Sequence, residues 1–300
     1  MELSWLMRIR IIAAFAVGVL LVGLLPYSLV RPPADGVFAI LSGSINISDL
    51  LICAALAFAA GFIASAICTP FGAQIGILAA PAGMVVWAIK SADLSTLFQA
   101  APAVNDRLAV YSSLRFESFV WLAIAGFGAV GALIADKFLN SKTVNLPDKF
   151  DPAFKLPTYA AIIIAVIGTI VVSNLLINIL AAGIRYTDIK VGHVTGQPAN
   201  FQIAFAVLVA FMACGFLAKL LIGVSFWFPA ASSVAVTIYS IISYSKKPAV
   251  EYLCANWPAV FFIKSIVSVL PIQMVAFGCI GAVWGYWLAA RFHLWRTLES

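Results

Sequence analysis

Long apolar runs alternate with short polar segments along the whole chain. Several runs contain about 20 residues, enough for a helix to cross a hydrocarbon core of about 30 Å. The pattern predicts eight membrane-spanning helices, over Ile11–Val30, Leu50–Cys68, Gly72–Ile89, Phe119–Ala135, Tyr159–Leu180, Phe201–Ile222, Phe226–Ser243 and Pro271–Arg291. The first run is longer than the apolar part of a signal peptide and ends in PYSLVRPP, so we interpret it as a retained span.

Two segments between the spans have a mixed pattern. In the first, apolar residues recur at alternating steps of four and three, at Leu97, Ala101, Val104, Leu108 and Tyr111. This spacing predicts an amphipathic helix that begins near Pro102 and lies in the outer headgroup region. The second segment, Pro258–Pro271, is almost wholly apolar and too short to span. It could lie on the surface, enter the membrane as a re-entrant half-helix, or pack beneath the other spans.

Similar strings occur twice in the chain, in the same order. AFAAGFIAS at Ala57–Ser65 resembles AFMACGFLAK at Ala210–Lys219, and GAVGALIADKF at Gly128–Phe138 resembles GAVWGYWLAARF at Gly281–Phe292, about 153 positions later. A constant offset of this kind indicates a tandem duplication. We therefore expect an all-α, polytopic helical membrane protein with four spans in residues 1–137, a polar linker over 138–157, and four spans in residues 158–300. Because each copy has an even number of spans, both copies should have the same orientation.

The basic residues near the span ends favour one orientation. Arg8 and Arg10 precede the first span, and the linker carries lysines at positions 142, 149 and 155. Since basic residues collect on the cytoplasmic side, both termini are expected in the cytoplasm. We expect the protein in the plasma membrane of a bacterium, the cytoplasmic (inner) membrane.

Composition supports the membrane class and excludes others. Hydrophobic residues make up 63% of the chain and charged residues only 10%, and the mean hydropathy is +1.06. These values exclude an ordinary soluble domain. The net charge of +6 is spread over many loops without a run of five basic residues, so no nucleic-acid partner is expected. Membrane lipids are the expected partners.

Groups for catalysis or metal binding are not clustered in the sequence. All 12 carboxylates lie in loops, tails or span edges, no CxxC pair occurs, and His193 and His293 lie far apart. Intramembrane proton or metal chemistry generally needs ionisable groups at membrane depth. We therefore expect no enzyme activity, no metal and no cofactor.

Helix breakers and polar residues within the spans are the candidate pathway or ligand-binding residues. A proline inside a span frees a backbone carbonyl, and such breaks often line transporter sites. The alternative is an ordinary kink, with the polar side chains serving only in hydrogen bonds between helices. The candidates are Thr69, Gln74, Pro81, Asn174, Asn178, Pro229, Lys264 and Gln273.

Lys264 and the glycine pairs need separate interpretations. Lys264 is the only cation in its apolar segment and could either extend to the interface or hold an anionic group. The pairs Gly72–Gly76 and Gly281–Gly285, and Gly128 with Ala132, predict close helix packing. Their positions suggest that spans four and eight meet each other.

Two hypotheses about function remain open. The first is a transport or permeation protein for a neutral or weakly anionic small molecule or lipid, because paired helix breaks in two parallel halves are typical of carriers. The second is a non-catalytic structural or assembly subunit of a larger membrane complex, with other membrane subunits or further copies of the chain as partners. A water-accessible cavity between the two halves would favour the first hypothesis, whereas a dry, fully packed seam would remove its main support.

Overall fold

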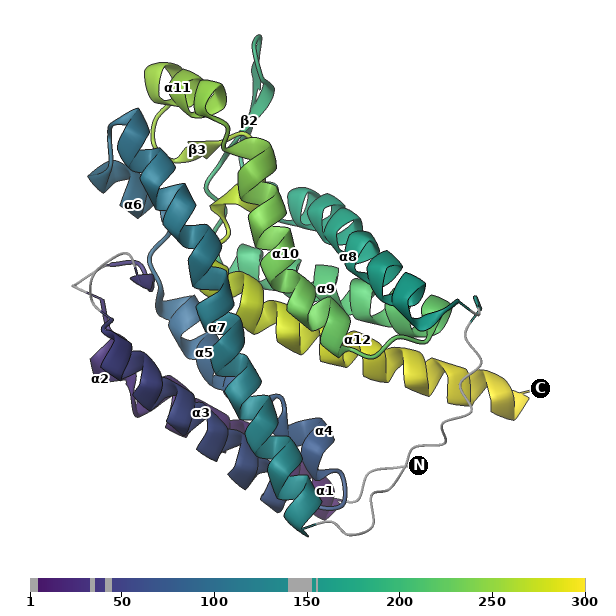
Figure 1. Ribbon diagram of the computed structural model, residues 1–300. Coiled ribbons are helices and arrows are strands. Elements are labelled where there is room, and N and C mark those ends of the chain that lie inside the picture. Colours follow the sequence, from purple (N-terminus) through teal and green to yellow (C-terminus); the bar gives the residue numbers. More distant parts are fainter. Residues whose placement is uncertain (1–4, 33–35, 41–44, 140–152, 155, 300) are drawn as a thin grey trace.

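A computed structural model describes residues 5–32, 36–40, 45–139, 153–154 and 156–299 (Figure 1). The first half contains α1 (Trp5–Gly18), a π-helical continuation η1 (Val19–Leu24), α2 (Tyr27–Val30), α3 (Ile47–Ile67), α4 (Gly72–Gly76), α5 (Ala79–Lys90), α6 (Leu94–Ala100) and α7 (Val104–Leu139). The second half contains α8 (Thr158–Leu180), α9 (Asn200–Leu217), η3 (Ala218–Ile222), α10 (Trp227–Tyr244), α11 (Lys247–Asn256), the 3₁₀ turn η4 (Ser265–Ser268) and α12 (Pro271–Glu299). Most of the predicted linker, 138–157, lies outside the described residues.

Within the part of the chain that the structure describes, seven helical segments are long and apolar enough to cross a membrane. They confirm a polytopic, helical membrane protein. The remaining predicted span corresponds to α10, which has 18 residues and no charged side chain. Its Ser, Thr and Tyr residues lower its hydropathy, so it is not among the seven. Whether α10 crosses decides whether both termini lie on one side of the membrane.

The predicted separate amphipathic helix before span four is wrong. One continuous helix of 36 residues, α7, runs from Val104 through the predicted span to Leu139. Neither glycine nor proline occurs before Gly126, so nothing interrupts the backbone hydrogen bonds between the two segments. The short helix α6 ends before Pro102, and its Phe98 packs edge-on against Tyr111 at 5.0 Å between ring centroids.

The segment before α12 packs beneath the helices. It forms a two-residue strand, β3 (Phe261–Phe262), and the turn η4, and residues 265–270 are all buried. The surface alternative is therefore wrong, and the half-helix of the re-entrant alternative is replaced by a short strand and a 3₁₀ turn. The Asn178 side-chain oxygen accepts a hydrogen bond of 3.1 Å from the Ile266 backbone N–H, so the segment is fixed by α8.

A small antiparallel sheet replaces the polar loop expected between spans five and six. Strands β1 (Arg185–Asp188) and β2 (Gly192–Gly196) form a hairpin in which Arg185 pairs with Thr195, and β2 also pairs with β3. Gly192 has φ of 78°, which suits glycine at the hairpin turn. The hairpin lies beside α11, at the end of the molecule where α6 also lies (Figure 1).

Glycines bring two pairs of helices into backbone contact. A Cβ on Gly61 would meet the Gly128 carbonyl, where α3 crosses α7, and a Cβ on Gly215 would meet the Ala282 carbonyl, where α9 crosses α12. Gly281 likewise faces α9 at Leu208. The close packing predicted from these pairs is therefore present, but each pair joins helices of the same half. Spans four and eight do meet, since α7 contacts α12, but the contact is not made through these glycines.

Helix α12 is the element that joins the two halves. It contacts α9 and α10 of its own half and also α5 and α7 of the first half. Its spanning segment and the α4–α5 segment are the most deeply buried of the seven. The core of the molecule therefore lies along the first turns of α12.

We predict that Gly281→Ala destabilises the protein while Gly168→Ala does not. The new methyl group at 281 would meet the Leu208 carbonyl oxygen and lie 3.0 Å from the Met212 nitrogen, whereas nothing lies within 4 Å at 168. Overpacking of this kind costs about 1–3 kcal/mol. Thermal unfolding in detergent should show a midpoint lower by several degrees for the first variant only. Equal midpoints would contradict the close α9–α12 contact.

Candidate functional site

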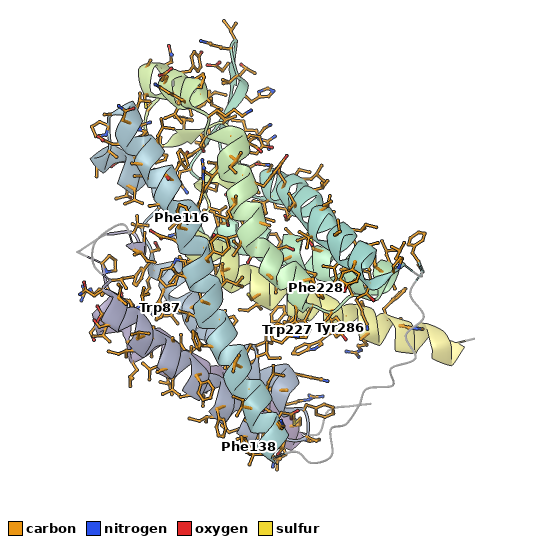
Figure 2. The ribbon with its side chains drawn as sticks, in the orientation of Figure 1. Trp87, Phe116, Phe138, Trp227, Phe228 and Tyr286 are labelled. Atoms are coloured by element: carbon orange, nitrogen blue, oxygen red, sulfur yellow. The ribbon has the colours of Figure 1, made fainter. Side chains whose placement is uncertain are left out.

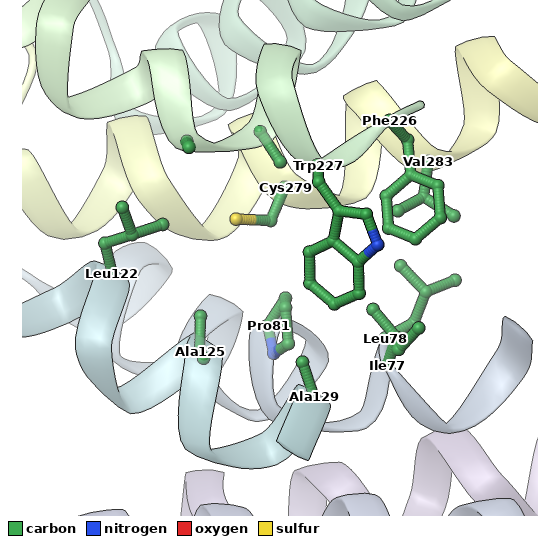
Figure 3. A pocket seen from close by; sticks show the side chains of 13 residues that line it. Ile77, Leu78, Pro81, Leu122, Ala125, Ala129, Phe226, Trp227, Cys279 and Val283 are labelled. Carbon is green, nitrogen blue, oxygen red and sulfur yellow. The ribbon is translucent and has the colours of Figure 1, made fainter. Parts of the chain in front are cut away.

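A cavity of about 190 Å³ lies between the two halves (Figure 3). The first half contributes residues from the α4–α5 turn, α5 and α7, and the second half contributes residues from α10, the turn before it, and α12. The thirteen lining residues are Ile77, Leu78, Pro81, Leu122, Ala125, Gly126, Ala129, Phe226, Trp227, Ala230, Ala231, Cys279 and Val283. A cavity therefore lies between the halves, but its lining differs from that of the water-accessible cavity that the transport hypothesis calls for.

The local sequence explains why space remains there. The helical span after Gly72 is interrupted at Ile77–Leu78, and Pro81 stands in the first turn of α5, where its missing N–H needs no helical partner. On α7 the facing residues are small: Ala125, Gly126 and Ala129. Small side chains opposite an interrupted helix leave a space that the neighbouring rings do not fill.

The second wall of the cavity is aromatic. Gly223, with φ of 74°, reverses the chain after η3, and Phe226 and Trp227 follow at the start of α10. Their rings lie 4.8 Å apart, and Figure 3 shows the indole of Trp227 reaching into the cavity opposite Pro81 and Ala129.

The lining is almost entirely apolar. The indole N–H of Trp227 is the single side-chain nitrogen or oxygen group among the thirteen residues, and the Cys279 sulfur is the other heteroatom. An apolar cavity of about 150 Å³ in another protein stays dry and binds benzene. This cavity is therefore suited to hold an apolar group rather than water or an ion. Among the described residues, no group of three or more His, Cys, Asp or Glu side chains could hold a metal ion.

A cation lies two aromatic rings away from the cavity. The Phe226 ring stacks edge-on against Tyr286 at 5.5 Å, and the Lys219 ammonium lies 4.8 Å from the centre of the Tyr286 ring. Tyr286 and Trp227 are close in Figure 2, where α10 begins above α12. This rim is at the end of the bundle where α1 and α8 begin and α12 ends.

Hydrogen bonds join the halves on the opposite side of the cavity. The Asn200 side chain donates to the Ser91 carbonyl at 2.7 Å, and the Gln273 side chain donates to the Ala88 carbonyl at 3.4 Å. Within the second half, Gln273 also donates to the Asn200 side-chain oxygen at 3.0 Å. Gln273 also accepts from the Leu270 N–H at 3.1 Å. Further out, Phe98 of the first half packs against Phe262 of the second at 5.8 Å. The two halves are thus closed together at this end.

The structure places the predicted site residues in several different locations. Pro81 lines the cavity. Pro229 is buried in the first turn of α10, Thr69 accepts a hydrogen bond from Arg10 through its carbonyl at 3.0 Å, and Gln74 is half-buried on α4. Lys264 is exposed.

The remaining predicted residues, all amides, form hydrogen bonds between elements. Asn178 donates to Asn174 at 2.8 Å, and Asn174 accepts from the Tyr244 hydroxyl at 3.3 Å. Gln273 belongs to the network at the closed end. Sequence reasoning missed the cavity itself because its lining carries no polar pattern, although the Phe226–Phe228 aromatic run before Pro229 was a signal for it.

Comparisons with protein families, curated proteins and solved structures find no match for this chain.

A second polar centre lies outside the spans, at Asp188. Its carboxylate accepts hydrogen bonds from the Lys190 and Val191 N–H groups, the Tyr252 hydroxyl and the Trp257 indole, at 2.8–3.1 Å. The bond from Val191, with those from Trp257, Lys190 and Tyr252, lowers the pKa of Asp188 to about 2. This carboxylate therefore fastens the hairpin to α11.

We predict that protonation of Asp188 in strong acid weakens the hydrogen bonds that hold the hairpin to α11. Because the folded-state pKa is below the usual value of 3.8, the carboxylate stabilises the hairpin fully above about pH 4 and progressively less as the pH falls toward 2. Hydrogen exchange of residues 185–196, corrected for the intrinsic rate, should accelerate over that range. In Asp188→Asn exchange should be fast at pH 7 already and should not change further. A wild-type hairpin equally protected at pH 2.5 and pH 6 would contradict this role.

We also predict that Gln273→Leu lowers the unfolding free energy by about 1–2 kcal/mol, since it leaves the buried Leu270 N–H without its acceptor. Gln74→Leu, a change of the same size on half-buried α4, should have little effect. Unfolding in denaturant-containing micelles measures both. If the two variants are equally stable, the Gln273 network does not hold the halves together.

Proposed function

We propose that this protein is a transport or permeation protein whose solute has an apolar body, such as a lipid or an amphipathic small molecule. The cavity between the halves is the observation that supports the proposal. Its lining favours an apolar group, and the thirteen residues include no carboxylate, imidazole, amine or guanidinium group, which argues against ion-coupled chemistry there. By the same argument we propose that the protein is not an enzyme.

The arrangement of the halves supports a rocking movement. They are closed by the Asn200–Ser91 and Phe98–Phe262 contacts at one end, and the cavity lies toward the other. Carriers with two repeated halves expose a central site to each side in turn by moving one half against the other. We propose that opening the closed end gives the cavity access to the second side of the membrane.

The bounds of the helices support the proposed duplication. Two pairs of elements begin 153 residues apart: α3 and α9, and α6 and α11. The glycine-mediated α3–α7 and α9–α12 contacts are a second parallel. We propose that the halves are a four-plus-four repeat with α10 as the eighth span, which would place both termini in the cytoplasm of a bacterial cell.

The proposal predicts that filling the cavity stops transport. The assay uses proteoliposomes of phosphatidylethanolamine and phosphatidylglycerol. The first arm measures the translocation of lipids that carry NBD on a short acyl chain, detected by dithionite quenching. The second arm measures the swelling of the proteoliposomes in glycerol or urea. Wild-type protein should accelerate at least one of the two. Ala125→Phe from α7 and Ala231→Phe from α10 should each reduce that rate at least tenfold because both add a ring to the lining.

Ala123→Phe is the matched control. It adds the same ring to α7 on the exposed side, so its rate should equal that of the wild type. Two results would contradict the proposal: no acceleration over protein-free vesicles in either arm, or full rates in both cavity variants.

The alternative, a subunit of a larger complex, is favoured by the hairpin. Ile184 and Ile189 are 66% and 107% exposed beyond the helices, and a large exposed apolar side chain at a hairpin tip is suited to contact a partner. Extraction in mild detergent followed by native mass spectrometry tests it. A stable partner that is lost in Ile189→Ser would favour this alternative, and a monodisperse single chain would exclude an obligate complex.

A further inference from the structure

The cavity between the halves is buried on one side and partly exposed on the other. Every lining residue from the α4–α5 turn, α5 and α12 is buried, and among these Pro81, Cys279 and Val283 form the floor. The lining residues that are partly exposed, within the described part of the chain, all come from α7, from α10 and from the residue before α10. They are Leu122, Gly126, Phe226, Trp227 and Ala231.

Two short edges frame the exposed side. Leu122 and Gly126 lie one helical turn apart on α7, and Trp227 and Ala231 lie one turn apart on α10, which contacts α7 (Figure 1). A Cβ on Gly126 would have nothing within 4 Å, so no neighbouring residue covers this edge. We call the opening between these four residues the slit. It extends over about 6 Å along each helix.

The surface around the slit is apolar. No charged residue occurs between Glu117 and Asp136 of α7, and α10 has no charged side chain. Phe127, which follows Gly126 on the outer face of α7, is 50% exposed. Leu122 and Gly126 lie in the apolar stretch that makes α7 a membrane-spanning helix, so the slit lies at the depth of the hydrocarbon core.

We propose that the cavity opens sideways into the bilayer through the slit and takes one acyl chain of a phospholipid from there. The second chain and the headgroup of that lipid stay in the bilayer. The inference rests on the proposed function, because it names the substrate class of the same cavity and the route by which that substrate enters.

Size and lining together select a chain. The cavity, at about 190 Å³, is somewhat larger than one of about 150 Å³ that binds benzene, so it holds a segment of roughly six to eight carbons. A partner helix, about 10–12 Å across with its side chains, is too wide for it. A polar solute would lose its hydration in the cavity and find in return a single side-chain N–H, that of Trp227.

The experiment uses the full-length protein in proteoliposomes of phosphatidylethanolamine and phosphatidylglycerol. A small share of phosphatidylcholine carries a diazirine midway along one acyl chain, and mass spectrometry locates the adducts after illumination. Surrounding lipid can label the exposed helix faces, whereas only a chain inside the cavity can label the buried floor at Pro81, Cys279 or Val283. We expect floor adducts. The same diazirine chain on phosphatidylglycerol should give an equal yield, because no charged residue borders the slit.

Variants at the slit test the route without disturbing the fold. Gly126→Leu should fold normally, because its Cβ enters open space and leucine favours a helix more than glycine does. It should reduce floor labelling at least tenfold, and Ala231→Leu should do the same from the opposite edge. Gly168→Leu is the matched control: Gly168 is half-buried on α8, also has nothing within 4 Å, and lies outside the lining. Its floor labelling should equal that of the wild type, whereas Ala125→Phe, which fills the cavity, should remove it.

The possible failures of this inference can be told apart from failure of the proposed function. If both slit variants keep the floor labelled and Ala125→Phe does not, a chain occupies the cavity but enters elsewhere, so the inference is wrong and the proposed function stands. A yield that depends on the headgroup would overturn recognition through the chain alone. A wild-type floor without adducts, or adducts that persist in Ala125→Phe, would also overturn the inference. In either case the proposed function fails as well only if neither lipid translocation nor swelling exceeds that of protein-free vesicles.

Discussion

The structure depends on the close contact of helix backbones inside each half. In a membrane, apolar side chains give helices no preference for one another over lipid, so contact must come from close packing. That packing is possible because the contact residues are glycines: Gly61 lies against Gly128, Gly215 against α12, and Gly281 against α9. A larger residue at any of these positions would separate the helices. Two rigid helix pairs result, α3 with α7 and α9 with α12. The remaining helices are arranged around these pairs.

Between the two pairs the packing is less uniform. At one end the Gln273 side chain donates a buried hydrogen bond to the Ala88 carbonyl of the first half, and Phe98 packs against Phe262. Toward the other end small residues of α7 face the ring of Trp227 across the cavity. A joint that is specific at one end and loosely filled at the other can open and close without disturbing the contacts within either half. The proposed carrier mechanism would depend on this difference between the two ends.

The sequence was sufficient for the spans and insufficient for the segments between them. Apolar runs of the length of Tyr159–Leu180 allow only a helix in a membrane, and α8 follows that range closely. The hairpin and η4 depend on distant partners instead: Asp188 on Tyr252 and Trp257, and Ile266 on Asn178. The pattern of apolar and polar residues within the hairpin and η4 therefore does not predict those contacts.

The candidate site could also be predicted only in part from the sequence. A search for polar residues in the spans found amides such as Asn174 and Gln273, which pair with backbone and with one another. The cavity arises instead from what is missing, namely bulk at Ala125 and Ala129, and this can be recognised only when the opposite wall is known. Pro81 was found because a helix break leaves a mark in the sequence.

The length of α7 has a mechanical consequence. Its 36 residues extend over about 54 Å, well beyond the thickness of a hydrocarbon core. Ala125 touches the cavity near the middle of this rod, and Val104 lies at its far end, about 30 Å away and next to the Phe98 contact. A rotation of roughly 5° about the cavity would displace that end by about 3 Å, since an uninterrupted helix transmits tilt along its whole length. In the proposed carrier, a molecule that binds in the cavity and tilts α7 would therefore also move the contact at Phe98.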